Sequence, residues 1–346
     1  IKPEPVVVPG QTYDICSGNI TNYHIELSNF INLVDNVIFT WPAPVLSPVD
    51  PAFSGGTARS SASSANIADI FTNTMGVTGT ATYTVTPYKD GCAGSPEAIT
   101  MTIRSQPVLD GGLNKTVCSN TPIGLILKEA AGSVSADYYN IISVTLDAGL
   151  SADPGNALIS NPTAPANYLF NDKYLNITGV DKNVTYRVQP VHDPDCFGEV
   201  VNVVITIRPQ PYIEPAQTKT VCSGIPVGKE ILLLPPNIPA GTIFNWPAPT
   251  MSDFSSQGSA GVNVQADPAG KIHINDILYN YSGSPITATY FVTPTSAAGC
   301  TGTTIPVVIT VNPEPVPVPI TGRDKICINE KNLVYSIPPV SGSAFH

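Results

Sequence analysis

The sequence predicts an all-β protein built from tandem β-sandwiches, and three observations support this prediction. A short stretch is written three times, as TYTVTPYKDGC, TYRVQPVHDPDC and TYFVTPTSAAGC, beginning at Thr82, Thr185 and Thr289. Charged residues make up only 12% of the chain, whereas 27 glycines and 35 prolines favour many short strands and turns. Seven cysteines recur at regular spacing. Self-similarity at a period of about 104 residues is typical of a modular array.

Proline-rich junctions divide the chain. Proline lacks the N–H that a sheet requires and keeps a linker extended, so we expect the units to follow one another as a semi-rigid rod. The chain opens on what looks like the end of a preceding repeat, and we expect it to be a piece of a longer protein. The junction prolines are Pro5, Pro107, Pro211 and Pro315, and the expected repeats are 1–106, 107–210 and 211–314, followed by a truncated start of a fourth, 315–346.

The first half of each repeat is predicted to supply early strands of the sandwich. In repeats one and three it is also predicted to supply a buried tryptophan. IGLILK and KEILLLP, which follow the first cysteine of repeats two and three, are predicted second strands. VIFTWPAP and TIFNWPAP then place Trp41 and Trp246 in the core, whereas repeat two reads NIISVTL, with Val144 in the tryptophan position.

Two strands with strict alternation are predicted in the second half of each repeat. Ala81, Tyr83 and Val85 face one side of the first of these strands, and threonines face the other. Ile99, Met101 and Ile103 do the same in the last strand, and both patterns return in the other repeats, where Tyr186 and Tyr290 replace Tyr83. About seven short strands in 100 residues, with a buried tryptophan and a disulfide, indicate an immunoglobulin-like sandwich.

The cysteines form an opening and a closing series, one member of each per repeat. Constant spacing within a repeat predicts one disulfide per repeat and an oxidising, extracytoplasmic compartment. A zinc site would need closely spaced cysteine pairs, which the sequence lacks. The predicted bridges are Cys16–Cys92, Cys118–Cys196 and Cys222–Cys300, with Cys327 unpaired because the sequence ends before its partner.

The same pair of polar residues recurs before the tyrosine of each T-Y-x-V-x-P segment. An aspartate lies 14 residues before the tyrosine, with an asparagine four residues after the aspartate. We interpret the aspartate as an Asx turn at a corner, with calcium as the alternative, although calcium prefers six or more oxygens. The pairs are Asp69 with Asn73, Asp172 with Asn176, and Asp276 with Asn280.

No arrangement of residues predicts catalysis. His192, Asp193 and Asp195 lie together as HDPD, and a metal site there is disfavoured because the matching loops read YKDG and TSAAG. A nucleophile also needs an oriented base, and the histidines occupy unrelated positions of their repeats. We therefore expect no enzyme, no catalytic residues, no metal site and no cofactor other than the calcium alternative.

Some aromatic side chains are candidates for sugar binding. Core packing is the competing interpretation, because about half of such residues should be buried in a sandwich. The candidates are Tyr138, Tyr139, Tyr168, Phe170, Tyr174, Tyr279 and Tyr281.

The charge distribution excludes two classes of partner. The net charge of −10 is spread thinly, which argues against nucleic acid and anionic membranes. No apolar run approaches the roughly 18 residues that span a bilayer.

The combination of W-P-A-P, I-x-D-x-x-x-N, T-Y-x-V-T-P, G-C-x-G and NPEP resembles the PKD-like repeats of secreted Bacteroidota surface proteins. It is most similar to the gliding-motility adhesins of the SprB type, over essentially the whole chain. The W-D-F-G-D-G signature of typical PKD domains is absent. The resemblance implies type IX secretion and a location on the outer face of the outer membrane.

Two functional hypotheses follow. The first is a stalk segment of a surface adhesin, whose partners would be neighbouring repeats, external surfaces or polysaccharides, and outer-membrane secretion or motility machinery. The alternative is a carbohydrate-binding or spacer array within a secreted polysaccharide-degrading enzyme.

Overall fold

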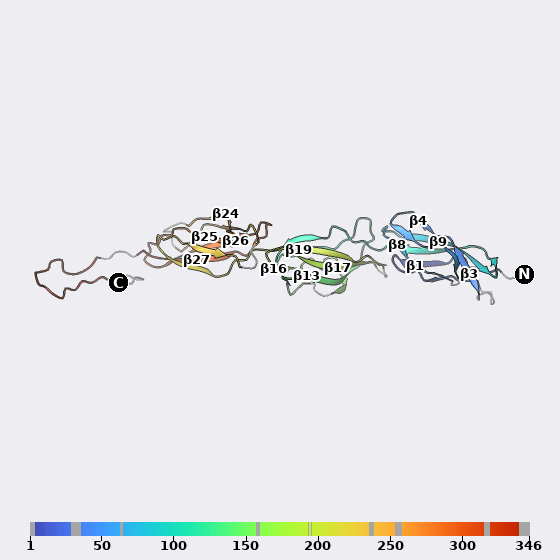
Figure 1. The fold of residues 1–346 in the computed structure, drawn as a ribbon, viewed down its shortest axis with the longest axis horizontal. Helices are drawn as coiled ribbons and strands as arrows, with labels where there is room; N and C mark the ends of the chain where they lie inside the picture. The colour runs from blue at the N-terminus through green and yellow to red at the C-terminus, as the bar shows by residue number, and fades with distance from the viewer. Residues whose placement is uncertain are drawn as a thin grey trace.

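The computed structural model describes residues 4–28, 36–62, 65–156, 160–192, 194, 196–234, 239–252, 258–314 and 319–338. These residues form strands, bridges and turns without any helix, and hence no helix that could cross a membrane. The all-β prediction is therefore confirmed. Three sandwiches follow one another along the longest axis, with the two chain termini toward opposite ends (Figure 1).

Repeat one has a main sheet in the order β1-β11-β9-β3-β6, to which β4 and β10 add along β9. The pairs β2–β7 and β5–β8 form two further small sheets. The strands are β1 (Thr12–Cys16), β2 (Tyr23–His24), β3 (Val37–Trp41), β4 (Val45–Ser47), β5 (Phe53–Gly55), β6 (Arg59–Ala62), β7 (Asn66–Ile67), β8 (Phe71–Asn73), β9 (Gly79–Lys89), β10 (Cys92–Ala93) and β11 (Glu97–Arg104).

Repeat two repeats this main sheet as β12-β19-β17-β13-β15, with β18 on β17 and the pair β14–β16 as a second sheet. The predicted strand IGLILK is wrong, because no strand is assigned there, although its alternate residues Ile123, Leu125 and Leu127 are buried. The strands are β12 (Lys115–Cys118), β13 (Tyr138–Leu146), β14 (Leu150–Ala152), β15 (Asn161–Ala164), β16 (Tyr174–Asn176), β17 (Lys182–His192), β18 (Cys196–Phe197) and β19 (Val201–Arg208).

Repeat three has the order β20-β27-β26-β22-β24, with β23 on β26 and the pair β21–β25. The predicted second strand in KEILLLP is confirmed by β21. The strands are β20 (Gln217–Cys222), β21 (Lys229–Leu232), β22 (Ile243–Trp246), β23 (Thr250–Met251), β24 (Gly261–Gln265), β25 (Lys271–Ile274), β26 (Ile286–Thr295) and β27 (Ile305–Asn312).

The first strand of each repeat runs parallel to the last strand, at the edge of the main sheet. Cys16 lies in register with Arg104, Cys118 with Arg208, and Cys222 with Asn312. The opening cysteine therefore lies at the end of the sandwich where the last strand finishes. We call this end the exit pole, and the opposite end, where the last strand starts, the entrance pole.

Each sandwich has its own hydrophobic core. The alternation predicted for the two long strands is confirmed, because Ala81, Tyr83 and Val85 are fully buried in β9. The last strands bury every second residue in the same way. The three core clusters extend from Val7 to Ile103, from Leu109 to Ile207, and from Ile213 to Val311.

In repeat two, Ile141 occupies the position that the tryptophans hold in repeats one and three. The prediction that Val144 occupies this position is therefore wrong. Phe39, Tyr139 and Phe244 each pair with the proline of T-Y-x-V-x-P, which fixes the register of the three strands. Two residues later come Trp41, Ile141 and Trp246, all buried. The prolines after each tryptophan separate β3 from β4 and β22 from β23, whereas β13 lacks them and continues unbroken to Leu146.

Candidate functional site

Two disulfides join neighbouring repeats. Cys16 of repeat one is bonded to Cys196 of repeat two, with a Cα–Cα distance of 5.2 Å. Cys118 of repeat two is bonded to Cys300 of repeat three, at 5.5 Å. Each bond thus connects the exit pole of one sandwich to the entrance pole of the next.

The prediction of one bridge within each repeat is wrong, and the parallel edge strand is the reason. Cys16 lies beside Arg104 at the end of β11, whereas Cys92 precedes the start of β11 at Glu97. The eight residues of β11 separate the two poles by roughly 25 Å at about 3.3 Å per residue. A disulfide needs Cα atoms about 4.4–6.8 Å apart, so an opening cysteine reaches only the closing cysteine of the following repeat.

The same arrangement leaves three exposed free cysteines among the described residues: Cys92, Cys222 and Cys327. Cys327 was expected to be unpaired, whereas Cys92 and Cys222 were expected to be bonded within their repeats. Cys92 belongs to the closing series, whose Cys196 and Cys300 are bonded across junctions, and Cys222 to the opening series, whose Cys16 and Cys118 are bonded.

A serine and an asparagine organise every exit pole. In repeat one the Ser17 hydroxyl accepts the N–H of Asn73 at 2.7 Å, and the Asn73 side-chain amide donates to the Ile103 carbonyl at 2.8 Å. The asparagine oxygen accepts the N–H two residues on, from Met75, which makes an Asx turn. The equivalent groups are Ser119, Asn176 and Ile207 in repeat two, and Ser223, Asn280 and Val311 in repeat three.

A proline and a glycine organise every entrance pole. The glycine of the C-x-G segment donates its N–H to the carbonyl of the T-Y-x-V-x-P proline, as Gly198 does to Pro190 at 2.8 Å. A Cβ at Gly198 would collide with the carbonyl of Pro107 and the ring of Pro190. Gly94 has the equivalent neighbours Pro5 and Pro87, and Gly302 has Pro211 and Pro294. The junction proline therefore passes directly over the closing loop.

Polar contacts add to the first disulfide at the junction between repeats one and two. Arg104 forms an ion pair with Asp14 at 2.9 Å and donates to the Pro194 carbonyl of repeat two at 2.7 Å. Gly76, at φ +77°, approaches Gly132 of repeat two so closely that a Cβ would collide with its backbone.

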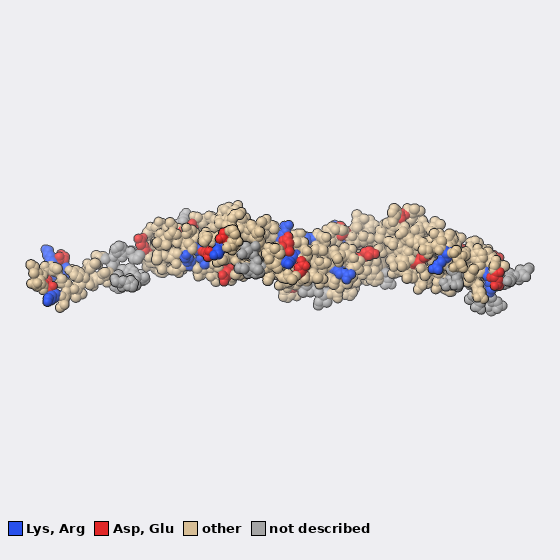
Figure 2. Space-filling view, in the orientation of Figure 1, with Lys and Arg blue, Asp and Glu red and all other residues tan. Residues whose placement is uncertain are grey.

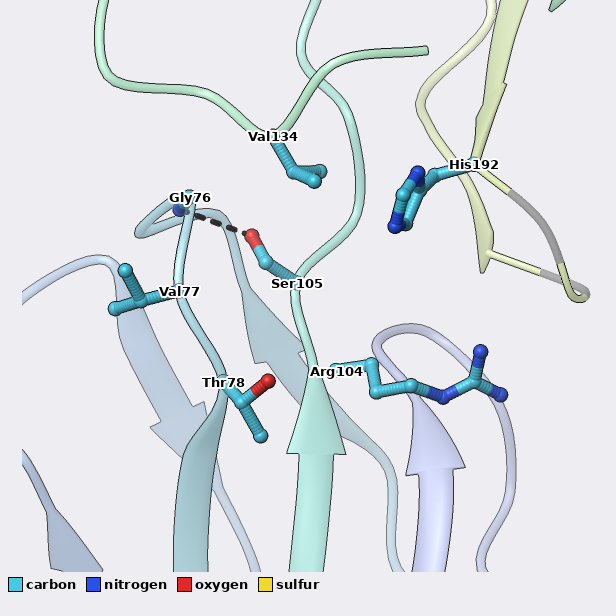
Figure 3. A pocket seen from close by; sticks show the side chains of 7 residues that line it. All are labelled: Gly76, Val77, Thr78, Arg104, Ser105, Val134 and His192. Carbon is cyan, nitrogen blue, oxygen red and sulfur yellow. Dashed lines mark hydrogen bonds between the residues drawn. The ribbon is translucent and has the colours of Figure 1, made fainter. Parts of the chain in front are cut away.

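A small cleft of about 140 Å³ remains at this junction (Figure 3). Val134 and His192 face it from repeat two. From repeat one it is lined by Gly76, Val77, Thr78, Arg104 and Ser105, and the Ser105 hydroxyl accepts the Gly76 N–H at 3.0 Å.

A larger cleft of about 390 Å³ lies at the junction between repeats two and three. Leu175 and Ile177, which flank the buried Asn176, supply apolar walls from repeat two. Tyr212 and Thr303 of repeat three face them.

The aspartates predicted to form Asx turns accept a hydrogen bond that the sequence did not predict. The Tyr83, Tyr186 and Tyr290 hydroxyls donate to Asp69, Asp172 and Asp276 at 2.5, 2.7 and 2.7 Å. Burial, and then the hydrogen bond to the aspartate, raises the pKa of Tyr83 and of Tyr290. The asparagine of each pair makes an Asx turn.

The Asp–Asn pairs are therefore occupied by bonds within the fold. Each aspartate faces its tyrosine, while each asparagine amide reaches the last strand. Within the described ranges, no group of three or more His, Cys, Asp or Glu side chains is arranged to hold a metal ion. Calcium binding would require displacing these bonds.

The HDPD segment is only partly described. The Nδ1 atom of His192 lies 2.9 Å from a carboxylate oxygen of Asp137, and the side chain faces the first junction cleft. Asp193 and Asp195 lie outside the described residues.

The aromatic candidates divide between core and surface. Tyr139 and Tyr174 are buried, and the Tyr174 hydroxyl is 2.6 Å from that of Tyr186. Burial raises the pKa of Tyr174 to about 12. Tyr138 and Tyr168 are partly buried, and Phe170 is exposed. Tyr279 and Tyr281 are exposed and stacked on each other, with ring centroids 6.0 Å apart.

Charged side chains are sparse and mixed on the face shown in Figure 2, and no extended patch of one sign covers it. The recurring features of the molecule are therefore its junctions. Sequence analysis did not single out Ser17, Ser119 and Ser223 or the C-x-G glycines as junction residues. Their repetition beside each cysteine was the available signal.

The fold defines a tandem array of immunoglobulin-like sandwiches, and the sequence identifies the type of sandwich. The sequence matches the PKD-like domain family over residues 13–107, 152–211 and 219–315. The chain belongs to this family. No curated protein matches the chain.

Solved structures with a similar fold are multidomain chains. A three-immunoglobulin structure of titin domains I67–I69 is 10% identical, with a TM-score of 0.34, covering 91% of this chain and 100% of that one. Mouse cadherin-23 EC22–24 is 11% identical, with a TM-score of 0.24, over 90% and 99%. The human desmocollin-1 ectodomain is 11% identical, with a TM-score of 0.22, over 92% and 62%.

Proposed function

We propose that this chain is a non-catalytic, tension-bearing stalk segment of an extracellular adhesin. The observation that carries the proposal is that both disulfides join neighbouring repeats. Disulfides persist in oxidising compartments, which supports an extracellular location.

Because of these bonds, tension has two covalent routes past repeat two. The first follows the backbone from Pro107 to Cys118 and crosses to Cys300 of repeat three. The second crosses from Cys16 to Cys196 and follows the backbone to Pro211. Both routes run from the entrance pole to the exit pole, and neither includes the chain between Cys118 and Cys196.

The two routes are short. Fully extended, Pro107–Cys118 spans about 40 Å and Cys196–Pro211 about 50 Å, whereas the whole segment from Pro107 to Pro211 would span about 350 Å. A sandwich with strands of about ten residues is itself roughly 35 Å long. Unfolding of repeat two therefore lengthens a bonded chain by less than about 20 Å.

The finer assignment is to a gliding-motility adhesin of a Bacteroidota species, exported by type IX secretion and carried on the outer face of the outer membrane. The recurring W-P-A-P, T-Y-x-V-T-P and NPEP motifs support it. Its partners would be neighbouring repeats, external surfaces or polysaccharides, and the secretion or motility machinery. An adhesin pulled along a surface needs a tether that holds its length.

Single-molecule pulling from the two ends of the chain tests the proposal. In oxidising buffer, the first unfolding event should add less than about 20 Å, whereas in reductant each repeat should add about 300 Å. The double variant Cys16→Ser/Cys118→Ser should give the long steps without reductant. The matched control, Cys92→Ser/Cys222→Ser, retains both bonds and should behave as the unmodified chain. Equal step lengths in oxidising and reducing buffer would contradict the proposal.

A further inference from the structure

The exit pole of repeat three resembles the two exit poles that are covered by a following repeat. Its Ser223–Asn280–Val311 hydrogen bonds match those of repeats one and two. The residues that flank Asn280 are Tyr279 and Tyr281, in the positions that Leu175 and Ile177 hold around Asn176.

In repeat two this position faces the next sandwich. Leu175 and Ile177 line the cleft whose opposite wall is Tyr212 and Thr303 of repeat three. In repeat three, the two tyrosines stack at an interplanar angle of 11°, and Tyr281 is 69% exposed. A stacked aromatic pair at the end of a sandwich offers a large apolar contact area at little cost in side-chain entropy.

A free thiol lies at the same pole. Cys222 is in register with Asn312, as Cys16 is with Arg104 and Cys118 with Arg208. Cys16 and Cys118 are bonded to closing cysteines, whereas Cys222 is exposed and reduced. The complementary surface also occurs in this chain, since the exposed Cys92 begins a Cys-Ala-Gly loop whose glycine packs against Pro5.

We propose that the exit pole of repeat three binds the entrance pole of a further repeat of this same type, and that Cys222 forms a disulfide with the closing cysteine of that repeat. Two thiols lose two protons and two electrons as the S–S bond forms. A small-molecule disulfide such as oxidised glutathione accepts them and is released as two thiols. The inference rests on the equivalence of the three poles and is independent of whether the array carries load.

A soluble sugar is the competing occupant of the tyrosine pair. The free thiol favours a further repeat over a sugar. Stacking on a sugar would not involve Cys222, whereas the equivalent Cys16 and Cys118 form disulfides across the junctions. The two rings are also stacked on each other, with centroids 6.0 Å apart.

The test uses the full chain carrying a tandem duplication of residues 209–312, which places a second repeat three after the first in the natural register. Thr301→Ser in the second copy marks its closing-cysteine peptide by mass. After folding in a glutathione redox buffer, free thiols are alkylated and the bonds are mapped under non-reducing conditions. We expect Cys222 of the first copy to be bonded to the marked Cys300, alongside the Cys16–Cys196 and Cys118–Cys300 bonds.

A second variant tests the apolar contact separately from the thiol. Tyr279→Ser/Tyr281→Ser in the first copy should slow formation of the new bond about tenfold without changing the other two. Alkylation of the first-copy Cys222, or its bonding to any other cysteine, would overturn the proposal. So would a glycan array on the unduplicated chain that finds oligosaccharide binding abolished by Tyr281→Ser.

Discussion

At the residue scale, a buried tyrosine–aspartate hydrogen bond recurs in each repeat. Tyr186 is fully buried, and its hydroxyl contacts both Asp172 and the Tyr174 hydroxyl. A hydrogen bond to a charged group contributes more than one between neutral groups, and losing one partner leaves the other buried without compensation. The pair therefore stabilises the core and fixes the segment before β16.

Removing the hydroxyl of Tyr186 should destabilise repeat two. We expect Tyr186→Phe to lower the free energy of unfolding by about 2 kcal/mol, because Asp172 loses a buried donor. Repeat two contains no tryptophan, so the shift should appear in circular dichroism during urea unfolding and leave the fluorescence transitions of Trp41 and Trp246 in place. The exposed Tyr281→Phe is the matched control. A shift seen only in tryptophan fluorescence would place the lost stability outside repeat two and would contradict the prediction.

The same tyrosines make stability depend on alkaline pH. Burial raises the pKa of Tyr83, Tyr186 and Tyr290 above the value of about 10 found in unfolded chains. The folded state then keeps protons that the unfolded state loses, so the stabilisation is complete below pH 10 and declines above it. Urea midpoints should fall between pH 10 and 12, after the free thiols have been alkylated. In the Tyr186→Phe variant, the urea midpoint of repeat two should fall less steeply with pH. Equal slopes of midpoint against pH in the variant and the unmodified chain would contradict the role of Tyr186.

At the scale of elements, the entrance pole depends on close contact between two loops. Gly198 lies against the Pro107 carbonyl and the Pro190 ring, two residues from the bonded Cys196. Overpacking at such a contact costs about 1–3 kcal/mol. Gly198→Ala should therefore displace Pro107 and leave more Cys16 and Cys196 thiol after oxidative folding, as measured by alkylation and mass spectrometry.

Gly111→Ala is the matched control, because a Cβ there meets no atom within 4 Å. Equal thiol content in the two variants would show that the entrance pole tolerates the added carbon.

The strands and their faces could be predicted from the sequence, because alternation with period two is a local property. The alternation of Ile99, Met101 and Ile103 placed β11 correctly. The disulfide partners could not be predicted, because the closing cysteines recur at the repeat period and spacing alone does not distinguish one repeat from the next. The choice depends on the parallel pairing of β1 with β11, which is not visible in either strand alone.

The tryptophan position shows the same limit. The sequence pattern placed Val144 in this position, whereas the strand register is fixed by pairing between β13 and β17. Only that pairing identifies Ile141 as the equivalent residue.

At the scale of the whole molecule, the two disulfides interlock the three sandwiches. The bonds have sequence separations of 180 and 182 residues, and the two covalent loops overlap from Cys118 to Cys196 of repeat two. Each junction combines one disulfide with a proline-held linker. Bending at the first junction would also break the contacts that Arg104 and Gly76 make with repeat two.

This arrangement leads to a prediction about shape in solution. Three sandwiches of roughly 35–40 Å each should give a rod longer than about 100 Å, and the disulfides should hold it straight. Small-angle X-ray scattering of the oxidised chain should therefore give an elongated profile. Cys16→Ser/Cys196→Ser should lower the maximum dimension, because the first junction then has only noncovalent contacts to resist bending.

The double variant Cys92→Ser/Cys222→Ser is the matched control, because it removes two thiols and breaks no bond. Its profile should superimpose on that of the oxidised chain, and reductant should convert both to the more bent form. A compact, near-spherical profile for the oxidised chain would exclude a rod. Identical profiles with and without the Cys16–Cys196 bond would mean that the linker and its contacts stiffen the junction alone.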